Sequence, residues 1–278
     1  MIKPQKLNFG TAGIPLSTPK PSTPNGILRV KELGLDAMEM EFVRGVRMSD
    51  QLAEESRQIA INSNIILTAH GPYYINLNSA EKPIIHASIE RILQTARTGY
   101  KAGAYSITFH PAFYGKTTKE DTYKTVRKAV EKIVATLKDE GIKIWVRPET
   151  MGKPSQFGTL EEIISLSQQI DMIMPCIDFS HMHAREGKMN TEDEFRSIFE
   201  NMEKDLGKES LKNLHCHLQG IEYGEKGEKR HRILEDSDMN YKTLLKIIKE
   251  FNCRGVIICE SPNIEQDAIL LKNTYKQI

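Results

Sequence analysis

Histidines and carboxylates stand at the carboxyl ends of several short apolar segments of this chain. His70 ends the segment Ile-Ile-Leu-Thr-Ala-His, and His110 ends the segment Ser-Ile-Thr-Phe-His. The same position in later segments is taken by four further residues, which are Glu149, Asp178, His217 and Glu260. Because a polar group at so many successive segment ends is improbable by chance, we expect these side chains to share one site.

The residue types indicate the chemistry of that site. Neutral imidazole and carboxylate, without a cysteine cluster, suit zinc or another borderline divalent ion. His181 follows Asp178 by three residues, so both side chains can reach one site from a strand end and its turn. These candidates exceed what one tetrahedral ion uses, so we expect two or three ions joined by a shared carboxylate. Converging carboxylates also need cations nearby, because buried like charges would otherwise take up protons.

The apolar segments that carry these residues alternate with amphipathic ones along the whole chain. Strands are predicted over residues 6–11, 37–42, 65–70, 106–110, 143–149, 172–178, 213–218 and 255–260. Helices, with apolar residues at intervals of three and four, are predicted over segments such as 50–63, 83–102, 119–140, 160–169, 191–206, 241–251 and 264–275. Thr118 and Thr191, each followed by acidic residues, are expected to cap two of these helices.

Eight strands that alternate with helices, without a linker or an internal repeat, predict a single (β/α)₈ TIM barrel domain over residues 1–278. An open doubly wound sheet is the alternative for such alternation. In a barrel, all carboxyl ends of the strands open on one face, where active sites lie. His215, two residues before His217, would point inward too, but would lie deeper in the barrel.

Composition places few further limits on function. Lys and Arg number 38 against 37 Asp and Glu, so the net charge of +1 gives no general sign of nucleic-acid binding. The 4 cysteines are too few and too scattered for a disulfide scaffold. We see no apolar run long enough for a membrane helix and no export signal, so we expect a cytoplasmic protein with no membrane partner. We also expect a monomer.

Several short motifs in order along the chain resemble endonuclease IV, the zinc-dependent apurinic/apyrimidinic endonuclease of DNA repair. They are Leu67-Thr-Ala-His70-Gly-Pro-Tyr-Tyr-Ile-Asn76-Leu77, Phe109-His110-Pro111, Pro148-Glu149-Thr150, Ile177-Asp178-Phe-Ser-His181, His217-Leu218, Arg230-His231 and Cys259-Glu260-Ser-Pro262. The resemblance starts at the Gly-Thr-Ala-Gly segment of residues 10–13 and covers essentially the whole chain.

The resemblance implies a TIM barrel with three zinc ions at the strand ends. By this likeness, the first ion is held by His70, His110 and Glu149. The second ion shares Glu149 and adds three ligands, Asp178, His217 and Glu260. The third ion is held by His181 and His231. Glu149 would set the separation of the first two ions, and Glu260 would help to orient the water that attacks.

The third ion position is where this chain departs from the family pattern. The family has an aspartate two residues before the position of His231, where this chain has Lys229. A protonated lysine cannot bind a cation. Glu228 is one residue away and could replace the aspartate if the loop bulges, whereas Glu225 is a weaker candidate. The number of zinc ions, two or three, therefore depends on this loop.

The resemblance also implies double-stranded DNA with abasic sites as the partner. Arg47, Tyr73 and Tyr74 occupy positions at which the family inserts loop residues into the duplex at the lesion. An arginine and an aromatic ring can stack on bases that lack a partner. The same two tyrosines could instead pack their own loop.

The expected reaction is hydrolysis of the phosphodiester on the 5′ side of an abasic site, leaving a 3′-hydroxyl and a 5′-deoxyribose phosphate. Two alternatives stay open. A sugar isomerase or epimerase of the same barrel superfamily would need one ion and a base, to which Glu39 or Glu41 could contribute. A metal-stabilised protein that binds damaged DNA or a sugar without turnover is the other, and it rests on Lys229 alone.

Overall fold

The chain forms a closed barrel of eight parallel strands, seen in a computed structural model that describes residues 2–278. In chain order, the barrel strands are β1 (Leu7–Ala12), β2 (Ala37–Glu41), β3 (Ile66–His70), β4 (Ser106–Phe109), β6 (Trp145–Pro148), β8 (Ile177–Asp178), β9 (Leu214–His217) and β12 (Gly255–Cys259). Strand β1 pairs with both β2 and β12. Bridges from β6 to the segment before β8 close the remaining gap. The predicted TIM barrel is thus confirmed.

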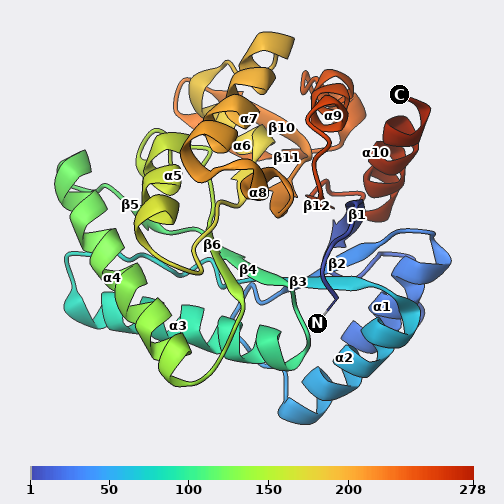
Figure 1. Cartoon of the computed structure of the whole chain (residues 1–278), viewed down its shortest axis with the longest axis horizontal. Helices are drawn as coiled ribbons and strands as arrows, with labels where there is room; N and C mark the ends of the chain where they lie inside the picture. The colour runs from blue at the N-terminus through green and yellow to red at the C-terminus, as the bar shows by residue number, and fades with distance from the viewer. Residues whose placement is uncertain (1) are drawn as a thin grey trace.

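Helices surround the strands, as Figure 1 shows. They are α1 (Thr23–Glu32), α2 (Asp50–Ser63), α3 (Lys82–Lys101), α4 (Lys119–Asp139), α5 (Leu160–Gln169), α6 (Phe179–Glu186), α7 (Glu192–Leu206), α8 (Lys208–Leu211), α9 (Tyr241–Glu250) and α10 (Glu265–Gln277), with a short 3₁₀ turn at Leu234–Asp236. Thr118 and Thr191 cap α4 and α7 as predicted, and Thr191 forms a capping box with Glu194. No helix within residues 2–278 combines the length and the apolar character that crossing a bilayer requires.

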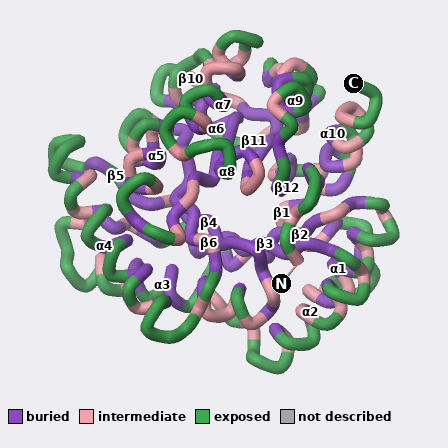
Figure 2. The backbone as a smooth tube through the Cα atoms, viewed as in Figure 1, coloured by how far each residue is buried: buried purple, intermediate pink, exposed green. Residues whose placement is uncertain are grey.

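Buried residues concentrate between the barrel and its ring of helices, while the outward helix faces are exposed (Figure 2). A second, smaller cluster contains Ala37, Ile66, Tyr105, Val256 and Ile258, which come from or next to four barrel strands. Since these side chains meet one another, they lie inside the barrel. Alternation along β2, β3 and β12 then directs the residues two and four positions further on into the same interior, closer to the carboxyl ends.

The structure differs from the predicted strand pattern at one barrel position. The sequence predicts a strand over residues 172–178, but only Ile177–Asp178 form a ladder, with isolated bridges at Ile173 and Cys176. Pro175 has no N–H to donate, and Met172 has a positive φ of 65°, so the regular ladder is interrupted there.

Two small antiparallel sheets lie outside the barrel sheet. Strands β10 (Gly220–Gly224) and β11 (Gly227–Arg232) form a hairpin after β9, and the short strands β5 (Ala112–Phe113) and β7 (Gln156–Phe157), which follow β4 and β6, form the other sheet. Both sheets come from loops that follow the carboxyl ends of barrel strands. They therefore lie on the face of the barrel where the predicted site residues are placed.

Candidate metal centre

All eight residues predicted to bind metal come together at the carboxyl ends of the barrel strands. His70, Asp178 and His217 are the last residues of β3, β8 and β9. The others stand immediately after strands, in helix α6 or in the β10–β11 hairpin, and they are His110, Glu149, Glu260, His181 and His231. Residues separated by more than a hundred positions thus meet because parallel strands end at one face.

Glu149 lies at the centre of this cluster and is fully buried. One carboxylate oxygen, Oε2, is 3.2 Å from Nε2 of His70. The other, Oε1, is 3.0 Å from Nδ1 of His181, 3.5 Å from Nε2 of His110 and 3.6 Å from Nδ1 of His217. A single carboxylate that faces four imidazoles has the placement of a bridging ligand.

Within residues 2–278, five groups of potential ligand atoms each have their atoms within 4.8 Å of one another, and two of them are Cys176, His215 and His217 and Glu39, Glu41 and Glu260. The other three contain the residues predicted to bind metal. They are His70, His110 and Glu149; Glu149, Asp178, His217 and Glu260; and His181, Glu228 and His231. Glu149 belongs to the first two, and His181 of the third group contacts Glu149 directly. These buried clusters of histidine and carboxylate indicate bound metal ions.

Unpartnered buried atoms support the same conclusion. Within residues 2–278, Glu149 Oε1 and His217 Nδ1 are buried without a hydrogen bond of suitable geometry. Buried polar atoms normally have a partner, because leaving one without costs about 1–3 kcal/mol. A cation between these atoms would provide the missing interaction. The donor set therefore fits divalent metal, and its imidazole content favours zinc over magnesium or calcium.

The third group has the dimensions of a zinc site. Nε2 of His181 is 3.4 Å from Nε2 of His231 and 3.6 Å from an oxygen of Glu228, and His231 is 3.8 Å from the other oxygen. Separations of this size are expected between ligand atoms that share one zinc ion, whose bonds to nitrogen and oxygen are about 2.0–2.2 Å long. These three side chains could hold an ion without rearrangement of the backbone.

A β-bulge at Lys229 explains how Glu228 joins this group. In the β10–β11 ladder, Glu222 pairs with Arg230 while Tyr223 pairs with Glu228, so Lys229 is the extra residue. In a regular strand, residues three apart point to opposite faces. The extra residue restores a common face for Glu228 and His231, and it leaves Lys229 exposed. The bulge therefore favours Glu228, over Glu225 or an incomplete site, as the residue that takes the place of the family's aspartate.

The hairpin is held against the barrel by a close backbone approach. The Glu228 N–H donates a 2.9 Å hydrogen bond to the carbonyl oxygen of Gly152, three residues after Glu149. A Cβ atom on Gly152 would lie 2.8 Å from Cβ of Glu228 and 3.1 Å from the ring of His181. Gly227 also approaches Gly152, with a φ of 84° that favours glycine. The two glycines thus allow Glu228 to reach the cluster.

Electrostatics in the cluster reflect a dense set of opposite charges. Burial alone would raise the pKa of Glu149, but the neighbouring His110 and His217 hold it well below the ordinary value. Burial would lower the pKa of His70, but its hydrogen bond to Glu149 and the charge of Glu41 raise it to about 10. The pKa values of His181 and His217 are also raised, so in the absence of a cation these three histidines carry protons that an incoming ion must displace.

A second layer of polar residues lies beneath the cluster, and the sequence reveals little of it. Glu39 on β2, His215 on β9 and Ser106 on β4 are fully buried inside the barrel. The sequence suggests Glu39 and Glu41 only as bases of an isomerase, and it gives His215 no role. Strand alternation is the one sequence signal that places the two glutamates inside the barrel, because Glu39 and Glu41 share their face of β2 with Ala37 of the interior cluster.

The rim of the site is more exposed than its floor. His110 and His231 have side chains 25% and 27% exposed, whereas His70 and His181 are about 2% exposed. The ring of Tyr73 lies 5.5 Å from the rings of both His70 and His110.

Tyr73 and Tyr74 are 49% and 61% exposed. Arg47 is also exposed, in the loop between β2 and α2. These three residues stand near the strand carboxyl ends, on the face that carries the cluster. The alternative in which both tyrosines only pack their own loop is not favoured by this exposure.

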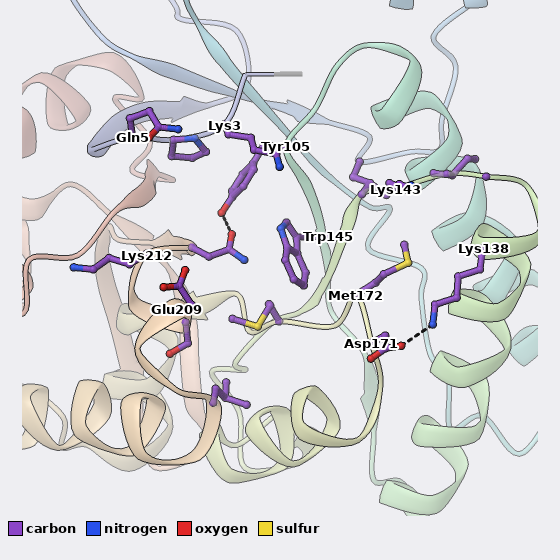
Figure 3. A pocket seen from close by; sticks show the side chains of 18 residues that line it. Lys3, Gln5, Tyr105, Lys138, Lys143, Trp145, Asp171, Met172, Glu209 and Lys212 are labelled. Carbon is purple, nitrogen blue, oxygen red and sulfur yellow. Dashed lines mark hydrogen bonds and ion pairs between the residues drawn. The ribbon is translucent and has the colours of Figure 1, made fainter.

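A cavity lies at the opposite end of the barrel and is separate from the cluster. It has a volume of about 920 Å³ and is shown in Figure 3. Its lining includes Gln5, Tyr105, Trp145 and Asn213, which precede or begin barrel strands. None of the predicted site residues lines it. Since catalytic sites of TIM barrels lie at the carboxyl ends of strands, the cluster is the better candidate for a catalytic site.

Comparison with known proteins agrees with the fold and with a metal centre. The model of the xylose isomerase-like TIM barrel family matches residues 27–274. An uncharacterized protein of Methanocaldococcus jannaschii is 42% identical over 273 residues, covering 98% of both chains. A probable endonuclease 4 of Aquifex aeolicus is 23% identical over 216 residues, covering 74% of this chain and 75% of its own. The resemblance to endonuclease IV is thus a distant one.

Solved structures are similar in fold at still lower identity. A D-tagatose 3-epimerase-like protein superposes with a TM-score of 0.74 at 18% identity, covering 96% of both chains. Endonuclease IV from Thermus thermophilus superposes with a TM-score of 0.73 at 16% identity, covering 96% of this chain and 98% of its own. Endonuclease IV and sugar epimerases are therefore equally distant. The chain belongs to the xylose isomerase-like TIM barrel family, and it is a metal-dependent enzyme of that superfamily.

Proposed function

We propose that this protein is a metal-dependent phosphodiesterase that incises DNA on the 5′ side of abasic sites, leaving a 3′-hydroxyl and a 5′-deoxyribose phosphate. The observation that carries the proposal is the third ligand group, His181, Glu228 and His231, beside the two groups joined by Glu149. A barrel that used one ion would have no need of His70, His110 and the bulged hairpin. Three adjoining groups suit the charge of a phosphodiester, which develops on several oxygens during in-line displacement.

The chain's own residues would divide the work. Divalent ions bound here would supply Lewis acidity and a lowered pKa for water. Glu149, held by four histidines, would keep the first two ligand groups at a constant separation. Glu260, whose side chain is 9% exposed and 3.5 Å from His217, would accept a hydrogen bond from the attacking water and orient it. His181 and His231 would fix the part of the centre nearest the leaving 3′-oxygen.

Recognition of the lesion would fall to the exposed rim. Tyr73 and Tyr74 offer aromatic faces beside His70, and Arg47 offers a guanidinium group in a neighbouring loop. An abasic site leaves the opposite base without a partner, and aromatic or guanidinium planes can stack on such a base. Near-zero net charge is compatible with this role, because local contacts at the lesion are sufficient to position the strand.

The proposal is tested with a duplex oligonucleotide that carries a single tetrahydrofuran abasic analogue. Wild-type protein loaded with zinc should cut the strand on the 5′ side, and prior treatment with a chelator should abolish the cut. The end left must be a 3′-hydroxyl that a polymerase extends. Glu149→Gln, which keeps the shape but removes the bridging charge, should be inactive. Absence of incision by fully metallated wild-type protein would overturn the assignment.

A sugar epimerase is the second candidate, and one observation favours it. Burial raises the pKa of Glu41, at the end of β2, to about 8, and Glu41 lies within ligand distance of Glu260. A carboxyl group that titrates near neutrality is suited to proton transfer at a carbon next to a carbonyl. Incubation with ketohexoses and a divalent ion, for wild type and Glu41→Gln, tests it. Epimerisation lost in the variant, with one ion per chain, would favour this candidate over DNA incision.

A further inference from the structure

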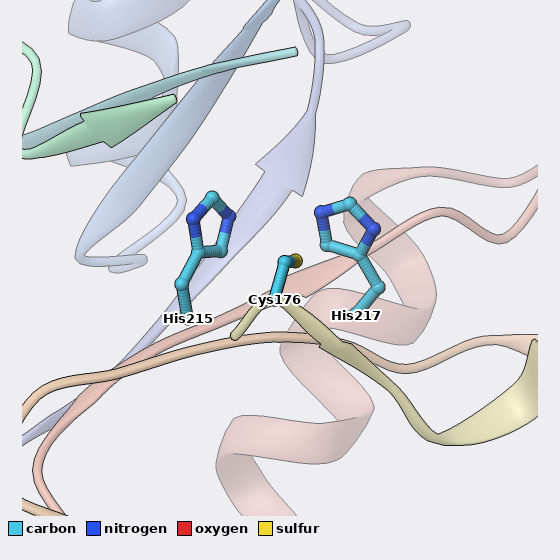
Figure 4. Close-up of side chains that lie close together, drawn as sticks. All are labelled: Cys176, His215 and His217. Carbon is cyan, nitrogen blue, oxygen red and sulfur yellow. The ribbon is translucent and has the colours of Figure 1, made fainter. Parts of the chain in front are cut away.

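Glu39 holds two histidines beneath the metal centre. Its Oε1 accepts a 2.9 Å hydrogen bond from Nε2 of His217, and its Oε2 lies 2.9 Å from Nε2 of His215. All three side chains are fully buried. Figure 4 shows the two imidazoles side by side on β9, with the Cys176 thiol between them. Each oxygen of Glu39 thus faces a histidine nitrogen, but only the contact with His217 has the geometry of a hydrogen bond.

The positions of the hydrogens follow from this geometry. An ionised carboxylate accepts hydrogen bonds and cannot donate them. Nε2 of His217, which is hydrogen-bonded to Glu39 Oε1, must therefore carry the hydrogen. In the neutral imidazole of His217 the lone pair is then on Nδ1, the atom that faces Glu260 Oε2 at 3.5 Å and Glu149 Oε1 at 3.6 Å. The ring thus turns its free nitrogen toward the ligand groups.

A further contact fixes the second histidine. Nδ1 of His215 is 2.9 Å from Oγ of Ser106, across the barrel on β4. Nε2 of the same ring lies 2.9 Å from Glu39 Oε2, so His215 lies between Ser106 and Glu39. The chain of contacts therefore runs from Ser106 through His215 and Glu39 to His217, entirely within the barrel. These contacts hold the Glu39 carboxylate in the orientation in which Oε1 faces His217.

We propose that Glu39 is a positioning residue for the metal centre, which selects the tautomer of His217 in which Nδ1 is free to bind the cation. His215 and Ser106 hold Glu39 in place for this role. A carboxylate that accepts from the far nitrogen of a metal-binding imidazole also makes that imidazole a stronger donor. The proposal depends on His217 being a metal ligand, but not on the identity of the substrate.

The decisive variant is Glu39→Gln, which is nearly isosteric. Its amide group has one acceptor oxygen, one donor nitrogen and no charge, so it cannot accept from both imidazoles and no longer strengthens His217 as a metal ligand. We expect zinc affinity, measured by competition with a chromogenic chelator, to fall by ~10- to 100-fold. Ser106→Ala, which removes the outermost contact, should give a smaller fall. Met40→Leu, a buried change on the same strand, is the matched control and should leave the affinity unchanged.

Nitrogen-15 spectra of the histidine rings read the tautomer directly, without any substrate. In zinc-loaded wild type, His217 should show a protonated Nε2 and a metal-bound Nδ1. Glu39→Gln, which offers one acceptor to two imidazoles, should change the ring-nitrogen shifts of His217 while its circular dichroism stays native. A protonated Nδ1 in loaded wild type would overturn the proposal. So would a folded Glu39→Gln protein whose zinc affinity lies within twofold of wild type. Neither readout depends on DNA incision, so failure of the proposed function would be seen separately.

Discussion

Replacing Glu228 tests whether the bulged hairpin completes a third ion position. In Glu228→Ala, the group formed with His181 and His231 keeps two nitrogens 3.4 Å apart and loses the only carboxylate. The two groups that share Glu149 keep every member. The substitution should therefore remove one ion per chain, from three to two, and leave the other two in place.

A lower bound can be given for the loss of metal affinity in Glu228→Ala. Loss of a residue that only supports a metal ligand costs ~10- to 100-fold in affinity. Loss of a direct ligand should exceed that, so we expect at least ~100-fold weaker binding of one ion, or about 2.8 kcal/mol. Stability of the apoprotein should change little, because the Glu228 side chain is 18% exposed and lies at a hairpin on the rim.

The assay is metal content by mass spectrometry after dialysis against buffered zinc, with native circular dichroism as the check on folding. Lys229→Ala is the matched control, because Lys229 is the adjacent residue and is exposed on the other face of the strand. It should retain three ions. The double variant Glu228→Ala with Lys229→Asp places an aspartate where the related endonucleases have one, and it should still hold two ions. Three ions in Glu228→Ala, or recovery of the third in the double variant, would refute the assignment of the bulge.

Three further outcomes are expected. Gly152→Ala should weaken binding of the third ion and lower the free energy of unfolding by ~1–3 kcal/mol, because the new Cβ would press on Glu228. Zinc binding and denaturant unfolding measure the two effects, and an unchanged ion affinity and unfolding free energy would contradict the close packing at Gly152. Zinc affinity should rise as pH rises from 6 to 9, because the pKa of His70 is raised to about 10 and zinc binding must release its proton. Chelator competition at several pH values measures the affinity, and an affinity independent of pH would contradict this prediction. Replacing Tyr73 and Tyr74 together with Ala should raise the Kd for an abasic duplex in fluorescence anisotropy and leave metal content unchanged, whereas equal binding would argue against stacking.

Much of the barrel could be predicted because its signals are local. The period of two along each strand and the alternation with amphipathic segments do not depend on distant residues. The same reasoning placed His70, His110, Glu149 and Glu260 at one face, since parallel strands carry their ends to a common edge. All four lie in the cluster that the structure describes.

The features that escaped prediction depend on pairing between distant or irregular segments. The β10–β11 register, and with it the choice of Glu228 over Lys229, is decided by a bulge that composition does not reveal. The contact between Glu39 and His215 joins β2 to β9 across the barrel, so neither residue signals it alone. The shortness of β8 follows from the positive φ of Met172, which is unusual for a non-glycine residue.

The metal content of the purified protein, measured together with incision of an abasic duplex, tests the three-ion centre around Glu149 most directly. Three zinc ions per chain are expected after loading, and stepwise removal by a chelator should abolish incision. One ion per chain in fully loaded, folded protein, with no cut on the 5′ side of the abasic analogue, would contradict it.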